Sequence, residues 1–189
     1  EAALKAERNA VRNRAAQRET DAANYTVPEN TVVIVQAENM SDQGGGSVRI
    51  AGHKRNTIGK AISGWDPVGH WLEYTVDAPA EGYYHLALLY CSAFDNCQRL
   101  LEVNGEPVDP DLVFTFAATG GWANNADDWR LKTLQNEVLE QPLLFKLNAG
   151  QNVIRMTNLN GKGVNLDYLA VVSPDVDPTR EMLTEMQQD

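Results

Sequence analysis

Residues 161–172 read Gly-Lys-Gly-Val-Asn-Leu-Asp-Tyr-Leu-Ala-Val-Val. The two glycines are typical of a loop, and the alternating apolar run that follows predicts a β-strand. Strict alternation would place Asn165 and Asp167 together on one face of that strand, opposite the apolar side chains of Val164, Leu166, Tyr168 and Ala170. Two short polar side chains therefore occur where a loop becomes a strand.

Such a polar pair has two interpretations. A carboxylate at this place can hold a hard cation, and an amide can hydrogen-bond to a hydroxylated ligand. Alternatively, both side chains only cap the backbone of the preceding loop. The rest of the chain has to distinguish the two.

Short runs of the same kind recur along the chain. They are separated by about ten residues and by Gly, Pro and Asn, with no long apolar helix between them. The predicted strands lie near residues 31–38, 48–50, 71–76, 83–90, 99–103, 112–116, 129–134, 143–147, 152–157 and 164–172. This spacing predicts an all-β fold, an antiparallel β-sandwich, over residues 25–174.

Both ends of the chain differ from this pattern. Residues 1–24 contain no Gly or Pro and few large apolar residues, which predicts a helical extension or linker. Residues 175–189 predict a second, C-terminal linker of helical type, with Asp177 as N-cap and Pro178 at the first helical position. Both tails are expected to join the sandwich to neighbouring modules of a larger protein.

Composition excludes several classes of function. The chain has 189 residues, 43% of them hydrophobic, and a net charge of −10. Residues 1–24 carry a net charge of +1, so the acidity belongs to the predicted sandwich. That charge argues against nucleic acid and against anionic membrane surfaces, and no apolar run approaches the ~18 residues of a membrane helix.

Catalysis has little support in the sequence. His53, His70 and His85 are scattered, none lies in a nucleophile or metal spacing, and no Gly-x-Ser-x-Gly elbow occurs. We therefore expect a protein that is not an enzyme. A lyase or hydrolase on the same fold is the alternative that turnover of a polysaccharide would reveal.

Cys91 and Cys97 are the only cysteines. Two thiols alone make a poor metal site, so a local disulfide that closes a short loop is the favoured interpretation, and two free thiols are the alternative. A disulfide would place the protein in an oxidising compartment, which means a secreted, extracellular or periplasmic location.

Two tryptophans lie in loops where a buried indole is not expected. Trp122 follows Gly120-Gly121 and precedes Asn124-Asn125, and Trp65 lies in Ser63-Gly64-Trp65-Asp66. The flat face of a sugar stacks its C–H groups on such a ring, while neighbouring amides bind its hydroxyls. Trp122 is the stronger candidate for a ligand contact and Trp65 the weaker one.

The acids at the ends of the predicted sheet suggest a cation site. Glu38 ends the first predicted strand, Asp167 lies in the last, and terminal strands are often neighbours in sandwiches. A calcium ion takes about 6–8 oxygen ligands, to which Gln36, Glu38 and Asp167 would contribute side chains.

Several of these segments together resemble a known family. They are Val-Gln-Ala-Glu at 35–38, Gly-His-Trp-Leu-Glu-Tyr-Thr-Val at 69–76, Pro-Ala-Glu-Gly-Tyr-Tyr at 79–84, Thr-Gly-Gly-Trp at 119–122 and Asn-Leu-Asp-Tyr at 165–168. In this order they resemble the family 6 and family 35 carbohydrate-binding modules, whose fold is a galactose-binding-like jelly roll. The resemblance covers about residues 31–173.

The resemblance implies specific roles. It implies a structural calcium held by Gln36, Glu38 and Asp167, and a sugar site in the loops at one end with Trp122 as stacking ring and Asn165 as hydrogen-bonding amide. Because these roles send Asn165 and Asp167 different ways, the chain is expected to bend or bulge between them.

One feature departs from the family. A second aromatic residue is common in the loop before the Gly-x-Trp strand, where this chain has Ile58-Gly59-Lys60-Ala61-Ile62. Lys60 cannot stack, although it can donate to hydroxyls or pair with a uronate carboxylate.

The sequence thus predicts a secreted, non-catalytic, calcium-stabilised module that binds carbohydrate. A structural or spacer domain that binds no sugar and assembles through its helical tails is the alternative.

Overall fold

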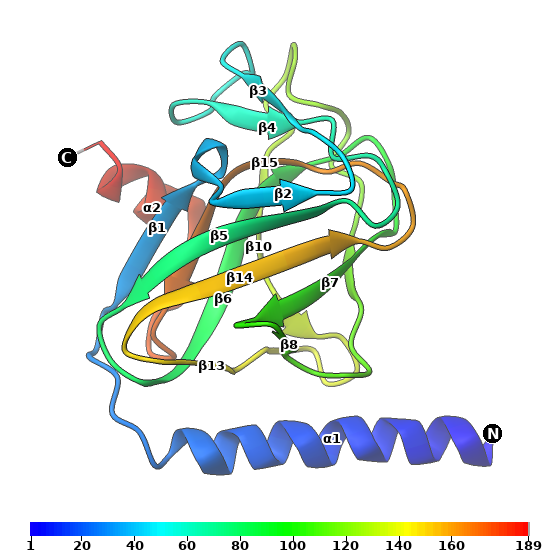
Figure 1. Cartoon of the computed structure of the whole chain (residues 1–189), viewed down its shortest axis with the longest axis vertical. Helices are drawn as coiled ribbons and strands as arrows, with labels where there is room; N and C mark the ends of the chain where they lie inside the picture. The colour runs from blue at the N-terminus through cyan, green and yellow to red at the C-terminus, as the bar shows by residue number, and fades with distance from the viewer. Residues whose placement is uncertain (189) are drawn as a thin grey trace.

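The computed structural model describes residues 1–188. Its elements follow the predicted order, with strands throughout the middle of the chain and an α-helix at each end (Figure 1). The helices are α1 (Ala2–Ala22) and α2 (Arg180–Met186), and a 3-10 turn, η1, covers Ala37–Asn39. The strands are β1 (Val32–Gln36), β2 (Asp42–Gly44), β3 (Arg49–Ala51), β4 (Ala61–Ser63), β5 (Trp71–Ala78), β6 (Gly82–Cys91), β7 (Cys97–Val103), β8 (Glu106–Pro107), β9 (Phe114–Phe116), β10 (Arg130–Thr133), β11 (Gln135–Asn136), β12 (Gln141–Pro142), β13 (Phe145–Leu147), β14 (Gly150–Asn158) and β15 (Asn165–Val172).

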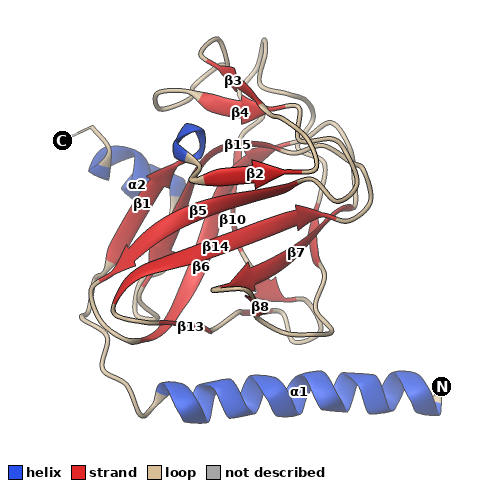
Figure 2. Cartoon of the chain, viewed as in Figure 1, coloured by secondary structure: helices blue, strands red, loops and turns tan. Residues whose placement is uncertain are grey.

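Two antiparallel sheets face each other, which confirms the predicted β-sandwich (Figure 2). The 7-stranded sheet runs β10-β6-β15-β4-β3, with β1 beside β15 and β13 beside β6. The 6-stranded sheet runs β2-β5-β14-β7-β8, with β9 beside β7. The main core lies between them, and the alternating burial along β5 and β14 shows why a period of two predicted these strands.

Strand β15 lies in the middle of its sheet and every one of its residues is buried. Its pairing with β6 shifts register between Leu166 and Tyr168, which is a β-bulge at Asp167. Before the bulge Leu166 faces the main core, and after it Leu169 and Val171 do. The bend expected between Asn165 and Asp167 is therefore confirmed, and strict alternation through Tyr168 is wrong.

A second apolar cluster covers the outer face of this sheet. It includes Tyr168, Trp129 and Cys91, and Leu183 of α2 closes it from outside. Helix α2 is therefore docked on its own sandwich rather than extended as a linker, and Arg180 adds an ion pair to Asp127 at 2.9 Å. Its N-cap is Thr179, whose hydroxyl accepts a hydrogen bond from the Met182 N–H, and not the predicted Asp177.

Helix α1 lies across one end of the sandwich (Figure 1). Residues 1–9 are exposed, whereas Val11 is buried in the main core. Arg14 and Arg18 form ion pairs with Asp109, at 3.0 and 2.9 Å. The predicted helix is present, and its second half packs against the sandwich.

Candidate functional site

The loops at the end of the sandwich away from α1 enclose an open pocket of about 210 Å³. Trp122 and Asn165, which the sequence singled out separately, both line it. The remaining lining residues are Arg49, Lys54, Ser63, Gly64, Asp66 and Asn124. The wall is therefore mostly polar around a half-buried indole. Such a combination suits a small, hydroxyl-rich ligand with one apolar face.

Two glycines allow the Trp122 loop its shape. Gly120 has a φ of +107°, which L-residues with a side chain rarely adopt. A Cβ on Gly121 would come within 2.6 Å of an Asp128 carboxylate oxygen, so a side chain there would displace the Asp128 carboxylate. That carboxylate also accepts a hydrogen bond from the Ala123 N–H at 2.9 Å. The Gly-Gly-Trp sequence is thus the consequence of a tight loop closed by Asp128.

The side chain of Asn165 is hydrogen-bonded to the loop that carries Trp122. Its Nδ2 donates to the Trp122 main-chain carbonyl at 3.3 Å, and its side chain is almost fully buried. Because Asn165 is the first residue of the buried strand β15, this hydrogen bond fixes the position of the Trp122 loop relative to the sheet. Asn165 is therefore a positioning residue for Trp122 as well as part of the pocket wall.

A second aromatic ring stands beside Trp122. Phe94 lies with its ring centroid 5.5 Å from that of Trp122, at an interplanar angle of 79°, and 47% of the residue is exposed. Sequence reasoning missed it, because it comes from the short turn between the two cysteines. The signal was an isolated aromatic in an otherwise polar turn, Ser92–Asn96.

The structure does not bring Trp65 to the pocket surface. Its ring is 1% exposed, its indole N–H donates to the His70 carbonyl at 2.8 Å, and the Arg99 guanidinium lies 4.0 Å from the ring centroid. A ring covered in this way has no free face for a sugar. The prediction of Trp65 as a ligand contact is wrong because a buried arginine already occupies the stacking position.

Lys60 is also absent from the pocket wall, and Lys54 takes that place. The loop turns so that the Lys60 N–H donates to Glu38 at 3.2 Å, whereas the Lys54 ammonium donates to the Asn124 side chain at 2.6 Å. Burial, with a smaller contribution from the positive charge of Arg49, lowers the pKa of Lys54. Two cations and one carboxylate, that of Asp66, thus surround the pocket.

The three residues predicted to hold a cation lie on adjoining elements. Gln36 ends β1, Glu38 lies in η1, and Asp167 is at the bulge of β15, the strand that pairs with β1. Each has one buried side-chain oxygen without a hydrogen-bond partner among the described residues: Oε1 of Gln36, Oε2 of Glu38 and Oδ1 of Asp167. Buried oxygens left unpaired are costly, and a hard cation would satisfy them.

The carboxyl group of Asp167 has a strongly raised pKa at this site. Burial is the main cause that raises the pKa of Asp167 to about 7, and the carboxylate of Glu38 raises it further. Two effects lower the pKa of Asp167: a hydrogen bond from the Ile58 N–H at 3.0 Å and the positive charge of Arg180. Within residues 1–188 no group of three or more His, Cys, Asp and Glu side chains could hold a metal, and here only two carboxylates and one amide meet.

The predicted disulfide is not formed. Cys91 and Cys97 are both free and buried. They belong to different apolar clusters, Cys91 on the outer face of the 7-stranded sheet and Cys97 in the main core, so their side chains do not meet. Burial raises the pKa of Cys91 to about 12, against a hydrogen bond with Asn165 that lowers it. In the described part of the chain, no helix is long and apolar enough to cross a membrane.

No family model and no curated protein matches this sequence. Solved structures do match it. A family 35 carbohydrate-binding module from Clostridium thermocellum has 28% identity and a TM-score of 0.59, covering 76% of this chain and 98% of that one. The second carbohydrate-binding module of lichenase 5A from Cellvibrio mixtus, determined with cellotriose, has 23% identity and a TM-score of 0.52, covering 77% and 98%.

A third structure, the C-terminal family 6 module of a marine laminarinase from Zobellia galactanivorans, has 17% identity and a TM-score of 0.54, covering 76% of this chain and all of that one. These comparisons confirm the resemblance to carbohydrate-binding modules of the family 6 and family 35 type and their β-sandwich fold. The match with the family 35 module covers 76% of this chain, so about a quarter of the chain lies outside it.

Proposed function

We propose that this chain is a non-catalytic carbohydrate-binding module of a larger secreted protein. The observation that carries the proposal is the presence of Trp122 and Asn165 in one open pocket. Structures of the same fold are carbohydrate-binding modules, one of them in complex with cellotriose, which supports the assignment. No residue is given a catalytic role.

The pocket would bind a sugar through two kinds of contact. The apolar face of a pyranose stacks on the indole of Trp122, and hydroxyl groups bind the side chains of Asn124, Ser63 and Asp66. Asn165 keeps the indole in place through its bond to the loop carbonyl. Because the loop is closed before the ligand arrives, little conformational entropy is lost on binding.

Arg49 and Lys54 bear on the kind of sugar. Their two positive charges outnumber the single carboxylate of Asp66 in the same pocket wall, so a sugar with a carboxylate is favoured over a neutral one. A matched pair, glucuronic acid and glucose, isolates this contribution because the two differ only at the carboxylate.

A calcium ion fits the separate site of Gln36, Glu38 and Asp167. When bound, it would supply positive charge to the buried carboxylate of Asp167 and the partly buried one of Glu38, and it would connect β1 to β15. The fit rests on the all-oxygen donor set and on the three unpaired buried oxygens. The metal is structural in this proposal and takes no part in binding the sugar.

A spacer domain is the second candidate, and one observation favours it. Leu4 is 64% exposed on the free half of α1, which leaves an apolar side chain available for assembly. Light scattering of the intact protein and of Leu4→Ser separates the readings, because a spacer would assemble through α1 and bind no glycan.

The proposed function is tested by calorimetric titration with a glycan panel. Trp122→Ala is expected to abolish measurable binding, while Val68→Ala, which removes an exposed side chain outside the pocket wall, leaves it unchanged. Equal affinity of the wild type and Trp122→Ala would refute the site. Absence of binding to every glycan, with tail-dependent assembly, would favour the spacer.

A further inference from the structure

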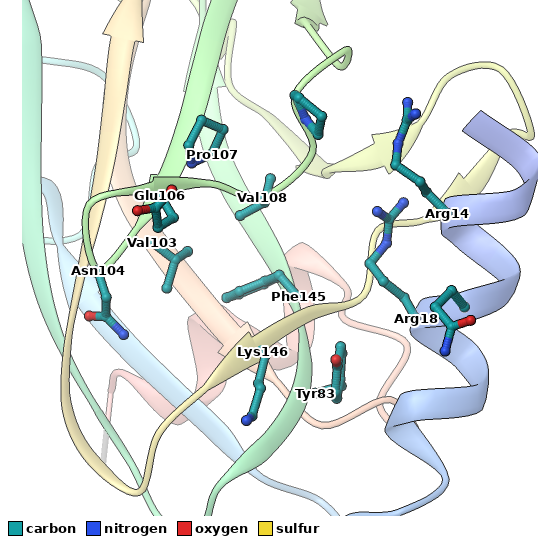
Figure 3. A pocket seen from close by; sticks show the side chains of 12 residues that line it. Arg14, Arg18, Tyr83, Val103, Asn104, Glu106, Pro107, Val108, Phe145 and Lys146 are labelled. Atoms are coloured by element: carbon teal, nitrogen blue, oxygen red, sulfur yellow. The ribbon is translucent and has the colours of Figure 1, made fainter. Parts of the chain in front are cut away.

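We propose a second binding site, between α1 and the sandwich, that takes a small amphiphilic carboxylate: an anion with an apolar ring or chain. The site is a cavity of about 380 Å³ (Figure 3). It is lined by Arg14, Gln17, Arg18, Tyr83, Val103, Asn104, Glu106, Pro107, Val108, Pro110, Phe145 and Lys146. Its size falls in the ~300–1,000 Å³ range of small-molecule sites.

This cavity and the sugar pocket lie at opposite ends of β7. Val103, the last residue of the strand, lines the cavity, whereas Cys97, the first, adjoins the turn that carries Phe94. The second site therefore does not rest on the proposed sugar binding. It exists because α1 crosses the end of the sandwich and adds a wall that the two sheets do not have.

The sandwich side of the cavity is apolar. Val103 and Phe145 are buried members of the main core, and Val108 packs against it. Figure 3 shows these three side chains together on the sandwich side of the cavity, with Arg14 and Arg18 extending from α1 toward them. A surface of this kind gains free energy when a ring or alkyl chain displaces water from it.

The helix side carries positive charge. Arg14 Nε donates to both oxygens of Asp109, at 3.2 and 3.0 Å, and Arg18 Nη1 donates to one of them at 2.9 Å. Asp111 lies 2.9 Å from Arg14 Nη2 but is half exposed. Two arginines thus share one fully buried carboxylate, and the second carboxylate is partly screened by water.

Two donors are left over in this arrangement. Nη2 of Arg14 and Nη2 of Arg18 are buried and have no hydrogen-bond partner among the described residues, although Asp111 lies 2.9 Å from the former. A buried guanidinium N–H without an acceptor is unfavourable, and an incoming anionic oxygen would satisfy it. A carboxylate suits the planar guanidinium because its two oxygens match the spacing of adjacent N–H groups.

The other charges at the cavity are weaker influences. Lys146 is held by Glu81 at 2.8 Å and lies over the Tyr25 ring, 4.9 Å from its centroid. Glu106 is exposed at the rim, where solvent screens its repulsion of an anion. Arg18 therefore favours a negatively charged group on the ligand, and the apolar side chains of Val103, Val108 and Phe145 favour an apolar group at the ligand's other end.

The test uses the full chain and a matched pair of probes, 4-phenylbutyrate and 4-phenylbutan-1-ol. The methyl resonances of Val103 and Val108 are followed by NMR during titration to about 10 mM, which covers the affinity range of such fragments. We expect saturable shifts with the carboxylate and at least about fivefold weaker binding of the alcohol.

Two variants locate the charge. Arg18→Gln removes one of the two free donors and is expected to weaken binding of the carboxylate at least about fivefold, whereas Arg12→Gln, on the exposed side of the same helix, leaves it unchanged. Because Arg18→Gln also removes a bond to Asp109, Gln17→Glu provides a second test that keeps that bond. It places a negative charge at the cavity, and its control is Ala16→Glu, an exposed position outside the cavity wall on the face of α1 that carries Arg12.

The expected pattern is weakening by Arg18→Gln and Gln17→Glu with no effect of either control. The proposal is overturned if no saturable shift occurs at Val103 and Val108, or if the alcohol binds as tightly as the carboxylate. It is also overturned if each control variant weakens binding as much as its partner.

Discussion

The Nδ2 of Asn165 donates a hydrogen bond to the main-chain carbonyl of Trp122 at 3.3 Å, across 43 positions of sequence. The bond joins the first residue of a buried central strand to the loop that presents an indole at the pocket. Asn165 is 3% exposed, so it offers little surface for direct contact with a ligand and acts mainly by positioning Trp122.

Replacement of Asn165 by alanine is expected to lower sugar affinity about tenfold or more, because the Trp122 loop loses its support. The lost buried hydrogen bond also costs about 1–3 kcal/mol of stability. Calorimetry and chemical denaturation measure the two effects. Asn152→Ala is the matched control, since it removes a buried, hydrogen-bonded amide that lies outside the pocket wall and should cost stability without loss of affinity. An equal loss of affinity in both variants would contradict the positioning role.

Phe94→Ala is expected to weaken sugar binding by about two- to tenfold, the size of an edge-to-face aromatic contact of ~0.5–1.5 kcal/mol. The contact between Phe94 and Trp122 is already present in the folded protein, so the free energy of unfolding should also fall by about 0.5–1.5 kcal/mol. Val113→Ala removes another exposed apolar side chain, away from Trp122, and serves as control. Unchanged affinity of Phe94→Ala would mean that the second ring plays no part.

Calcium is expected to raise the melting temperature of protein previously treated with a chelator. At a concentration of ~100 Kd the gain is about 2.7 kcal/mol, or about 5–10 °C for a domain of this size. Asp167→Asn should remove the response, and without metal it should be at least as stable as the wild type because a buried carboxylate is gone. Asp77→Asn, an exposed change, should respond like the wild type; an unaltered response of Asp167→Asn would refute the metal site.

The docking of α1 is expected to fail in acid. Burial raises the pKa of Asp109, but hydrogen bonds from Arg14, the Asp111 N–H and Arg18 outweigh it, so the pKa lies below its ordinary value. A lowered folded-state pKa means stability that is present above the unfolded pKa of about 4 and is lost as pH falls through the folded value.

The measurement is amide hydrogen exchange of α1 as a function of pH, after correction for intrinsic rates. Asp109→Asn should show at neutral pH the weak protection that the wild type shows only in acid, at a cost of about 1–3 kcal/mol. Asp111→Asn, whose side chain is half exposed, should change protection little. Unchanged protection of α1 in Asp109→Asn would contradict the role of this carboxylate.

The two cysteines should react as free thiols only after unfolding. Burial raises the pKa of the Cys91 thiol to about 12, and both side chains are inaccessible, so a thiol reagent at pH 8 should label neither in the folded protein. Two thiols per chain should appear in denaturant without reductant. Finding none there would restore the disulfide that the sequence suggested.

The sandwich could be predicted because its evidence is local. Each strand of β5 and β14 buries alternate residues, and Asn104-Gly105, with φ of 51° and 85°, supplies the tight turn that its sequence indicates. The bulge at Asp167 could be inferred only through the resemblance, since alternation alone assigns one face to Asn165 and Asp167. Strands and tight turns, which depend on residue propensity and on the period of apolar residues, could therefore be predicted from the sequence.

The rest depends on contacts between distant parts of the chain. Trp65 looks like a loop indole until Arg99, 34 residues later, is seen above its ring. Lys54 and Lys60 lie in the same loop, and nothing in their sequence neighbourhood indicates which of them reaches the pocket. The path of the loop brings Lys54 there. The tails looked like linkers because Asp109, which holds α1, is 91 residues from Arg18.

The central claim is that sugar binds beside Trp122, and the indole N–H resonances test it most directly. Titration with a glycan that binds should shift the Trp122 indole N–H and the Asn124 side-chain amide together, with one common dissociation constant, and leave the indole of buried Trp65 in place. Saturable binding that moves resonances elsewhere and leaves the Trp122 indole unchanged would contradict the account.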